Sequence, residues 1–144
     1  MAVIALPIPA LPRRLFDHID LRVRNRARAQ EFFAKVLPAI GFTLDKSAEE
    51  WGAFEKDGAG KPSEFFGFTE DANHRPNDTR IAFWAKTREQ VDRIAQVVRE
   101  AGGQNLEGPQ IWPEYSPDYY ALFFEDPDGN KLEICCRGSV VVAE

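Results

Sequence analysis

The sequence predicts an α+β fold made of two similar units, each with the order strand, helix and about three strands. The first observation is a repeat, because the segment 18–41 aligns without gaps on the segment 80–103, 62 positions further along the chain. Ile19 then matches Ile81, and Gly41 matches Gly103. The second observation is that the same order of apolar and polar residues recurs at this offset. We therefore expect two tandem βαβββ units whose curved mixed sheets enclose a common cleft.

Length and composition fit one soluble domain. The chain has 144 residues and a mass of 16.3 kDa, and 44% of its residues are hydrophobic. This size suffices to bury a core without disulfides or a structural metal. The 18 Lys and Arg residues are outnumbered by 23 Asp and Glu residues, which gives a net charge of -5. No basic stripe is present, so nucleic acid is not expected as a partner.

The first unit is expected to begin with a strand at His18, because apolar and polar residues alternate from there to Val23. A helix is expected next, with Asn25 as its N-cap and Gly41 at its C-terminal end. Residues at helical spacing form its apolar stripe. They are Ala29, Phe32, Phe33, Val36 and Ile40.

The second unit repeats this pattern from Arg80. Its first strand has apolar residues at 81, 83 and 85 and is followed by Thr87 and Gln90, which have the spacing of a capping box. The apolar stripe of the second helix comprises Val91, Ile94, Ala95 and Val98. Gly102 and Gly103 are expected to end this helix.

Short strands are expected after each helix, separated by clusters of Gly, Asp and Pro. They are residues 42–45, 51–55 and 64–68 in the first unit and residues 119–124 and 131–136 in the second. Residues 57–62 and 71–78 are expected loops. We therefore divide the single domain of residues 1–144 into an arm of residues 1–14 and two units, 15–72 and 78–137.

The ends of the chain favour a cytoplasmic protein. Residues 1–11 are apolar, but Pro7 and Pro9 interrupt them, no basic residue leads them, and they are shorter than the roughly 20 residues that span a bilayer. We expect an extended arm, with neither a signal peptide nor a membrane partner. Cys135 and Cys136 are adjacent and unsuited to a structural disulfide, which fits a reducing compartment.

The last 26 residues contain a motif of known type. Tyr-Tyr-Ala-Leu-Phe-Phe at 119–124, Asp-Pro-Asp-Gly-Asn at 126–130 and Lys-Leu-Glu at 131–133 resemble the last hairpin of the vicinal oxygen chelate superfamily. This superfamily includes glyoxalases, bleomycin-resistance proteins and extradiol dioxygenases. The segment 18–23 likewise resembles its first strand, and Pro-Glu-Tyr at 113–115 is similar to a glyoxalase-like bacterial subgroup. The resemblance covers about residues 15–136 and implies the two-unit fold and a homodimer.

The turn in this motif has a physical explanation of its own. Pro127 fixes one backbone angle, Asp128 is expected to cap the turn locally, and Gly129 or Asn130 supplies a left-handed residue. Alternation after the turn places Glu133 on the same strand face as residue 135. Glu133 therefore either points into the cleft or is an exposed acid.

The resemblance implies a metal site with one ligand from the first strand of each unit and a glutamate from the last strand. His18 and Glu133 occupy the first and last of these positions, and Arg80 stands where a second histidine is expected. Imidazole and carboxylate ligands suit Zn, Ni, Mn, Fe or Mg ions. A guanidinium offers only donors, so it cannot be a ligand. A metal-free site is an equal alternative, with Arg80 hydrogen-bonded to Glu133.

Each of the two histidines has more than one expected role. Without a metal, His18 is expected to hydrogen-bond to Glu133 or Asp20. His74, in the loop before Arg80, is either solvent-exposed or a substitute ligand.

Aromatic residues are expected around the same cleft, and they are Trp84, Trp112, Tyr115, Tyr119 and Tyr120. Each has a polar group beside a large apolar ring. With Arg80 and Arg22 they suit a flat ligand that carries a carboxylate. Their alternative role is packing in the core or a dimer interface. Cys135 is expected to be a buried thiol, because its only candidate base is His18 and no third group that would orient this base is evident.

Two main functions follow, and the residues leave both enzyme and binding protein open. The first is a glyoxalase-like protein that binds a small oxygenated molecule in a cleft lined by His18, Arg80, Trp84, Tyr120 and Glu133. If it catalyses, we expect lyase or isomerase chemistry with Glu133 and His18. Oxygen-dependent ring cleavage is less favoured, because it requires two histidines. The alternative is a metal-free protein of the bleomycin-resistance type that sequesters its ligand. A third option is a structural dimer with a closed cleft.

Overall fold

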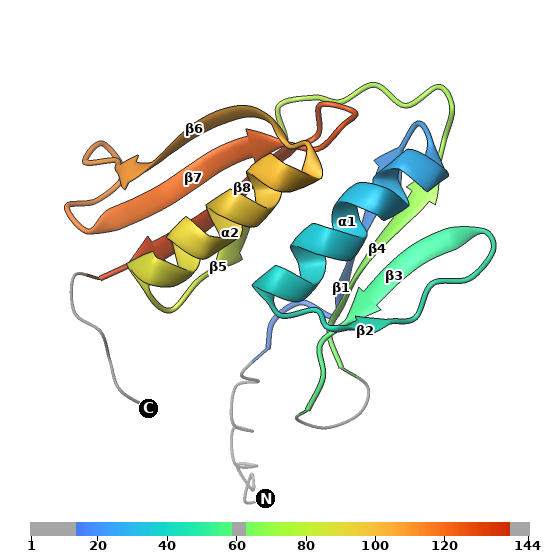
Figure 1. Cartoon of the computed structure of the whole chain (residues 1–144), viewed down its shortest axis with the longest axis horizontal. Coiled ribbons are helices and arrows are strands. Elements are labelled where there is room, and N and C mark those ends of the chain that lie inside the picture. Colours follow the sequence, from blue (N-terminus) through green and yellow to red (C-terminus); the bar gives the residue numbers. More distant parts are fainter. Residues whose placement is uncertain (1–13, 59–62, 139–144) are drawn as a thin grey trace, which may run out of the picture.

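The computed structural model describes residues 14–58 and 63–138, and both predicted units are present (Figure 1). Each unit has one helix and one four-stranded mixed sheet, which confirms the α+β prediction. The expected arm of residues 1–14 lies outside the described residues except for Arg14.

The first unit consists of β1 (His18–Val23), α1 (Arg26–Ile40), β2 (Leu44–Asp45), β3 (Trp51–Glu55) and β4 (Phe65–Glu70). Its sheet has the order β1-β4-β3-β2, with β1 parallel to β4 and the remaining pairs antiparallel. β1 is therefore an edge strand. The first strand after α1 was expected to span residues 42–45 and is shorter, with only two residues in the ladder.

The second unit consists of β5 (Arg80–Trp84), α2 (Arg88–Ala101), β6 (Gln104–Ile111), β7 (Tyr119–Glu125) and β8 (Lys131–Arg137). Its sheet has the order β5-β8-β7-β6, so β5 is the edge strand that corresponds to β1. No strand was expected at the position of β6. Gly108, Pro109 and two register shifts interrupt the alternation of this strand, which hides it from a two-residue pattern.

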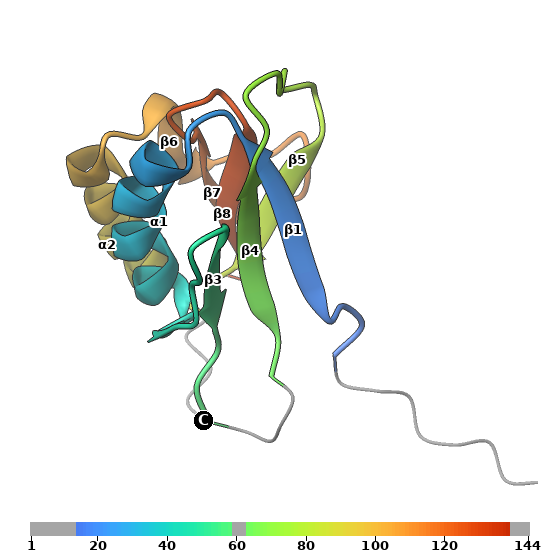
Figure 2. The same ribbon diagram turned by 90° about the vertical axis from the view of Figure 1, so that its right-hand side faces the viewer.

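The predicted helix caps are confirmed. The Asn25 side chain accepts a hydrogen bond from the Arg28 N–H at 2.9 Å, and Gly41 ends α1 with a φ of 137°. Thr87 and Gln90 form the expected capping box at the start of α2. α1 and α2 lie side by side against the same side of the two sheets (Figures 1 and 2). Neither helix of the described part of the chain is long and apolar enough to cross a membrane.

The larger of two clusters of buried hydrophobic residues in the described part of the chain lies between the helices and the sheets. Its largest completely buried side chains come from both helices and from β4, β7 and β8. They include Phe32, Phe33, Phe66, Phe68, Leu122, Phe124, Leu132 and Ile134. Residues of the opposite parity on each strand, Glu133 among them, are left on the face away from the helices.

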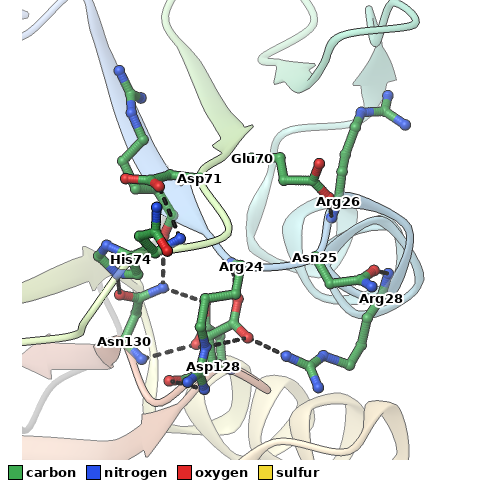
Figure 3. Close-up of polar contacts among 12 residues, drawn as sticks. Arg24, Asn25, Arg26, Arg28, Glu70, Asp71, His74, Asp128 and Asn130 are labelled. Carbon is green, nitrogen blue, oxygen red and sulfur yellow. Dashed lines mark hydrogen bonds and ion pairs between the residues drawn. The ribbon is translucent and has the colours of Figure 1, made fainter.

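The turn between β7 and β8 connects the two units (Figure 3). Asp128 is buried, with its side chain 2% exposed, and it accepts hydrogen bonds from the Arg24 N–H at 2.7 Å and from the Arg28 guanidinium. Arg24 and Arg28 belong to the first unit, at the β1–α1 turn and on α1. We call these contacts the Asp128 cluster. The prediction that Asp128 caps its own turn was wrong.

The local cap is supplied by Asp126 instead. Its carboxylate accepts hydrogen bonds from the backbone N–H groups of Asp128 and Asn130 at 2.9 and 2.8 Å. Gly129 has a φ of 91°, so it is the left-handed residue that the turn requires. Asn130 extends the connection between the units, because its side chain donates to the Arg22 carbonyl at 3.0 Å.

Candidate functional site

A groove of about 610 Å³ lies between the units, where the edge strands β1 and β5 face each other. Its volume is within the range of about 300–1,000 Å³ that is typical of small-molecule sites. Apolar side chains from both units line it, and they are Ile19, Phe42, Phe66, Ile81 and Phe83. Arg80, Ala82 and Trp84 of β5 also line this groove, together with Lys56 and Glu64. Of the residues predicted to line the cleft, Arg80 and Trp84 line this groove, whereas His18, Tyr120 and Glu133 are not among its lining residues.

Glu133 lies beside this groove on the face of the second sheet that points away from the helices. In the strand ladder it is paired with Ala82 of β5 on one side and Phe123 of β7 on the other. We call the surface formed by Arg80, Ala82, Tyr119, Phe123 and Glu133 the Glu133 face. Ala82 is exposed, so a small side chain leaves the centre of this face open.

Glu133 is only 4% exposed, which resolves the alternative left by the sequence in favour of a buried acid. The Tyr119 hydroxyl donates a hydrogen bond to its Oε2 atom. Burial and the contact with Glu133 raise the pKa of Tyr119 above its usual value, so the hydroxyl keeps its proton as a donor. Only this one oxygen of Glu133 has a hydrogen-bond partner among the described residues.

Arg80 does not form the expected pair with Glu133. Its guanidinium lies over the Phe123 ring, 4.7 Å from the centroid, and donates to the Leu132 carbonyl at 3.4 Å. The flat guanidinium stacks on the aromatic ring, and Glu133 is already bonded to Tyr119.

Two of the predicted aromatic residues, Trp112 and Tyr115, lie next to the Glu133 face. The Trp112 ring packs edge-on against Phe123 at 4.9 Å, and its indole N–H donates to the Ala121 carbonyl at 3.0 Å. Tyr115 is 60% exposed and lies 5.2 Å from the Tyr119 ring. Trp84 is 58% exposed and lines the groove, as predicted for a residue on the face of Arg80.

Tyr120 does not line the cleft, which corrects the prediction. It follows Tyr119 on β7, so strand alternation directs it to the helix side of the sheet. There its hydroxyl donates to Asp92 of α2 at 2.5 Å, and Arg88 lies 5.4 Å from its ring centroid. Burial and the bond to Asp92 raise the pKa of Tyr120 to about 12.

His18 lies on the first sheet and does not join Glu133 or Asp20. Its ring stacks on Phe65 at 4.5 Å, and its Nδ1 atom is 2.7 Å from the Asp17 carboxylate. His18 also lines a separate pocket of about 260 Å³ with Asp20 and Trp51. The imidazole therefore belongs to a different surface of the described structure from the Glu133 carboxylate.

The donor set of these residues does not fit a divalent ion. Among the described residues, no three His, Cys, Asp or Glu side chains are grouped as metal ligands. His18 contacts Asp17, and Glu133 accepts a hydrogen bond from Tyr119. Arg80, which the repeat aligns with His18, is a permanent cation and cannot be a ligand.

The remaining candidates have structural roles. His74 is neither exposed without a partner nor a ligand, because its Nε2 atom is 2.7 Å from Asn130 Oδ1 in the interunit turn (Figure 3). Cys135 is buried on the Glu133 side of β8, and this burial raises the pKa of its thiol. A thiolate is therefore disfavoured, as expected for a packing residue.

Sequence reasoning missed the pairing of Tyr119 with Glu133 and the position of Arg137. Arg137 lies opposite Tyr119 in the ladder, and its guanidinium is 4.8 Å from the Tyr119 ring centroid. Alternation along β8 places residues 133, 135 and 137 on one face, and this signal was sufficient to include Arg137. The register with β7 that selects Tyr119 over Tyr120 depends on the hairpin geometry.

Comparison with protein families gives one result. The profile of the Glyoxalase/Bleomycin resistance protein/Dioxygenase superfamily matches residues 15–134. No curated protein sequence matches the chain.

Comparison with solved structures shows the same fold. A glyoxalase/bleomycin resistance protein from Albidiferax ferrireducens T118 is 23% identical, with a TM-score of 0.69 over 87% of this chain and 100% of that one. The fosfomycin resistance protein FosX from Mesorhizobium loti is 17% identical, with a TM-score of 0.61 over 90% and 96%. A mutant FosX from Listeria monocytogenes, also 17% identical, has a TM-score of 0.61 over 86% and 90%. That structure contains Mn(II) and 1S,2S-dihydroxypropylphosphonic acid.

The raised pKa of Tyr120 predicts a loss of stability at alkaline pH. The usual tyrosine pKa is 10.0 and the folded value is about 12, so the unfolded chain releases this proton first as the pH rises. Stability is therefore lost between pH 10 and 12. The free energy of unfolding in urea should fall between pH 8 and pH 11 for both proteins. The fall should be smaller for Tyr120→Phe than for the wild type, by on the order of 0.5 kcal/mol after solvent screening. Tyr115→Phe is the control, and an equal effect of both variants would contradict the assignment.

The donor set also predicts the response to metal ions. After treatment with a chelator, the Tm of the protein should be the same in about 1 mM Mn²⁺ as in the same concentration of Mg²⁺. Binding at 100 times the dissociation constant would add about 2.7 kcal/mol and raise Tm by several degrees. Such a rise with Mn²⁺ alone, together with near-stoichiometric metal in elemental analysis, would show that the ligands rearrange around an ion.

Proposed function

Because the chain belongs to the Glyoxalase/Bleomycin resistance protein/Dioxygenase superfamily, we propose that it binds a small oxygenated organic molecule where the interunit groove meets the Glu133 face. Glu133 then accepts a proton from a carbon next to a carbonyl group of that molecule, which is the first step of lyase or isomerase chemistry.

The burial of Glu133 carries this proposal. Burial removes most of the hydration of a carboxylate that is 4% exposed, and one hydroxyl partner replaces only part of it, so this acid destabilises the fold. A role in function accounts for its presence. The neighbouring strand offers exposed Ala82 opposite this acid and thus room for a ligand atom. One oxygen is fixed by Tyr119, and the other remains as a base.

The groove supports a ligand with an apolar portion. Its walls are mainly aliphatic and phenylalanine side chains, and a molecule that fills it also meets Arg80 and Ala82 at its β5 side. Ala82 is paired with Glu133. The small hydroxylated compound in the Listeria structure is of a size that suits such a position.

A second candidate is binding without catalysis. Arg80, which cannot be a metal ligand, occupies the position where the resemblance expects a second histidine, and this favours a ligand-sequestering protein that needs no ion. Both candidates use the same groove. They differ in whether Glu133 transfers a proton.

The decisive experiment compares the wild type with Glu133→Gln. Glutamine keeps the shape of the side chain and can still accept the Tyr119 hydrogen bond, so the fold should be preserved. The protein is incubated in D₂O with dihydroxyacetone, 2-oxobutanoate and 3-oxobutanoate, and exchange of the hydrogen next to the carbonyl is followed by NMR. The wild type should exchange at least one compound faster than buffer. Glu133→Gln should slow this exchange by roughly 10²–10⁴-fold.

Glu31→Gln is the matched control, because Glu31 is an exposed acid on α1. It should exchange the compound at the wild-type rate. Equal rates for the wild type and Glu133→Gln would contradict the catalytic proposal. Binding of a compound by the wild type without any exchange would favour the sequestering function instead.

A further inference from the structure

We propose that the ligand of this site is an anion, a short-chain hydroxy- or oxo-carboxylate whose carboxylate group binds the guanidinium of Arg80. This inference rests on the proposed function, because it assigns the chemical class of the molecule that meets Glu133.

The arginines on the Glu133 side of the second sheet differ from others in the chain. Arg22, Arg24 and Arg28 each lie against an aspartate, as expected in a chain with more acidic than basic residues. Within residues 14–58 and 63–138, Arg80 and Arg137 form no ion pair with an acid, and each stacks on an aromatic ring, as Arg88 does on the helix side of the sheet.

Stacking leaves the hydrogen-bonding edge of a guanidinium available. The ring of Phe123 contacts the flat face of Arg80, and Leu132 accepts one hydrogen bond at a long 3.4 Å. A guanidinium has five N–H donors in its plane, which match the two oxygens of a carboxylate. The Phe123 ring fixes the orientation of Arg80 and reduces the conformational freedom lost on binding.

The acidic residues near this cation each have another partner. Asp78 is fully exposed and forms its ion pair with Lys131 at 3.0 Å, and its interaction with Arg80 ranks below that pair. Glu64, which lines the groove, pairs with Lys56 at 3.5 Å. Glu125 accepts from Asn105, and Glu107 is exposed on β6 and lies two strands away from Glu133. Glu133 itself is bonded to Tyr119.

The position of Glu133 limits the length of the ligand. The Arg80 guanidinium lies 4.7 Å from the centroid of the Phe123 ring, and Phe123 is the ladder partner of Glu133 on β7. A carboxylate at Arg80 therefore leaves the next few atoms of the molecule near the Glu133 oxygen. Those atoms must carry a proton that Glu133 can accept, because a second anionic group there would be repelled. A hydroxyl group or the hydrogen next to a carbonyl meets this requirement.

The test uses three probes with the same alkyl chain and different charges. They are 2-hydroxyhexanoate, the neutral 2-hydroxyhexanamide and the cationic 1-amino-2-hexanol. Binding to ¹⁵N-labelled protein is followed by amide chemical-shift changes, and resonances of β5 and β8 report on the site. The carboxylate should bind at least about tenfold more tightly than the amide, and its affinity should fall as salt concentration rises.

Variants identify the anchoring group. Arg80→Gln should weaken binding of 2-hydroxyhexanoate by about tenfold or more without changing that of the amide. The affinity of Arg80→Lys for 2-hydroxyhexanoate should lie between those of the wild type and Arg80→Gln, because lysine keeps the charge without the planar pair of donors. Arg93→Gln is the control, since it removes one exposed positive charge from α2 on the opposite side of the sheet.

Each outcome decides between the two proposals. Equal affinity for the carboxylate and the amide, or equal effects of Arg80→Gln and Arg93→Gln, would overturn the anion assignment. If only the amide or the amine shifts β5 and β8 resonances, the site stands and its ligand is not an anion. If none of the three binds, the anion assignment is overturned, and the exchange experiment with Glu133→Gln judges the proposed function separately.

Discussion

The arrangement of this protein depends on the buried carboxylate of Asp128. The two sheets share no strand pairing, so the relative position of the units is set by the contact between α1 and α2 and by the turn between β7 and β8. Asp128 is nearly inaccessible, and its partners Arg24 and Arg28 are half-exposed residues of the other unit. Separation of the units would leave this carboxylate without its charged partners, which is costly for a buried group. The neighbouring bonds of Asn130 to Arg22 and His74 add to the same connection.

This connection brings together the two walls of the interunit groove. The groove has one wall from each unit, because Ile19 and Phe66 belong to the first and Ile81 and Phe83 to the second. The edge position of β5 leaves its outer side open to this groove. Glu133 is buried on the next strand, β8, where it pairs with Ala82, one of the residues that line the groove.

Much of the fold could be predicted from the sequence, because its signals are local. The alternation from His18, the cap at Asn25 and the capping box at Thr87 are each determined by neighbouring residues, and the structure confirms them. The repeat added the two-unit architecture. The strand Gln104–Ile111 was missed because its register shifts remove the periodic pattern.

The site was predicted less completely because its contacts are between distant parts of the chain. The sequence identified Glu133 and Arg80 but paired them, whereas Tyr119 and Phe123 are their actual partners. The choice between Tyr119 and Tyr120 depends on register, and alternation alone cannot fix it. The interunit role of Asp128 could not be inferred either, because Arg24 lies more than 100 residues away.

The most direct test of this account is a double-mutant cycle between Arg28→Ala and Asp128→Asn, measured by urea unfolding. If the Asp128 cluster joins the units, the two single changes should not add, and the coupling free energy should be about 1–3 kcal/mol. Effects that add within about 0.5 kcal/mol would show that Asp128 stabilises only its own turn, and the account of the interunit groove would then be contradicted.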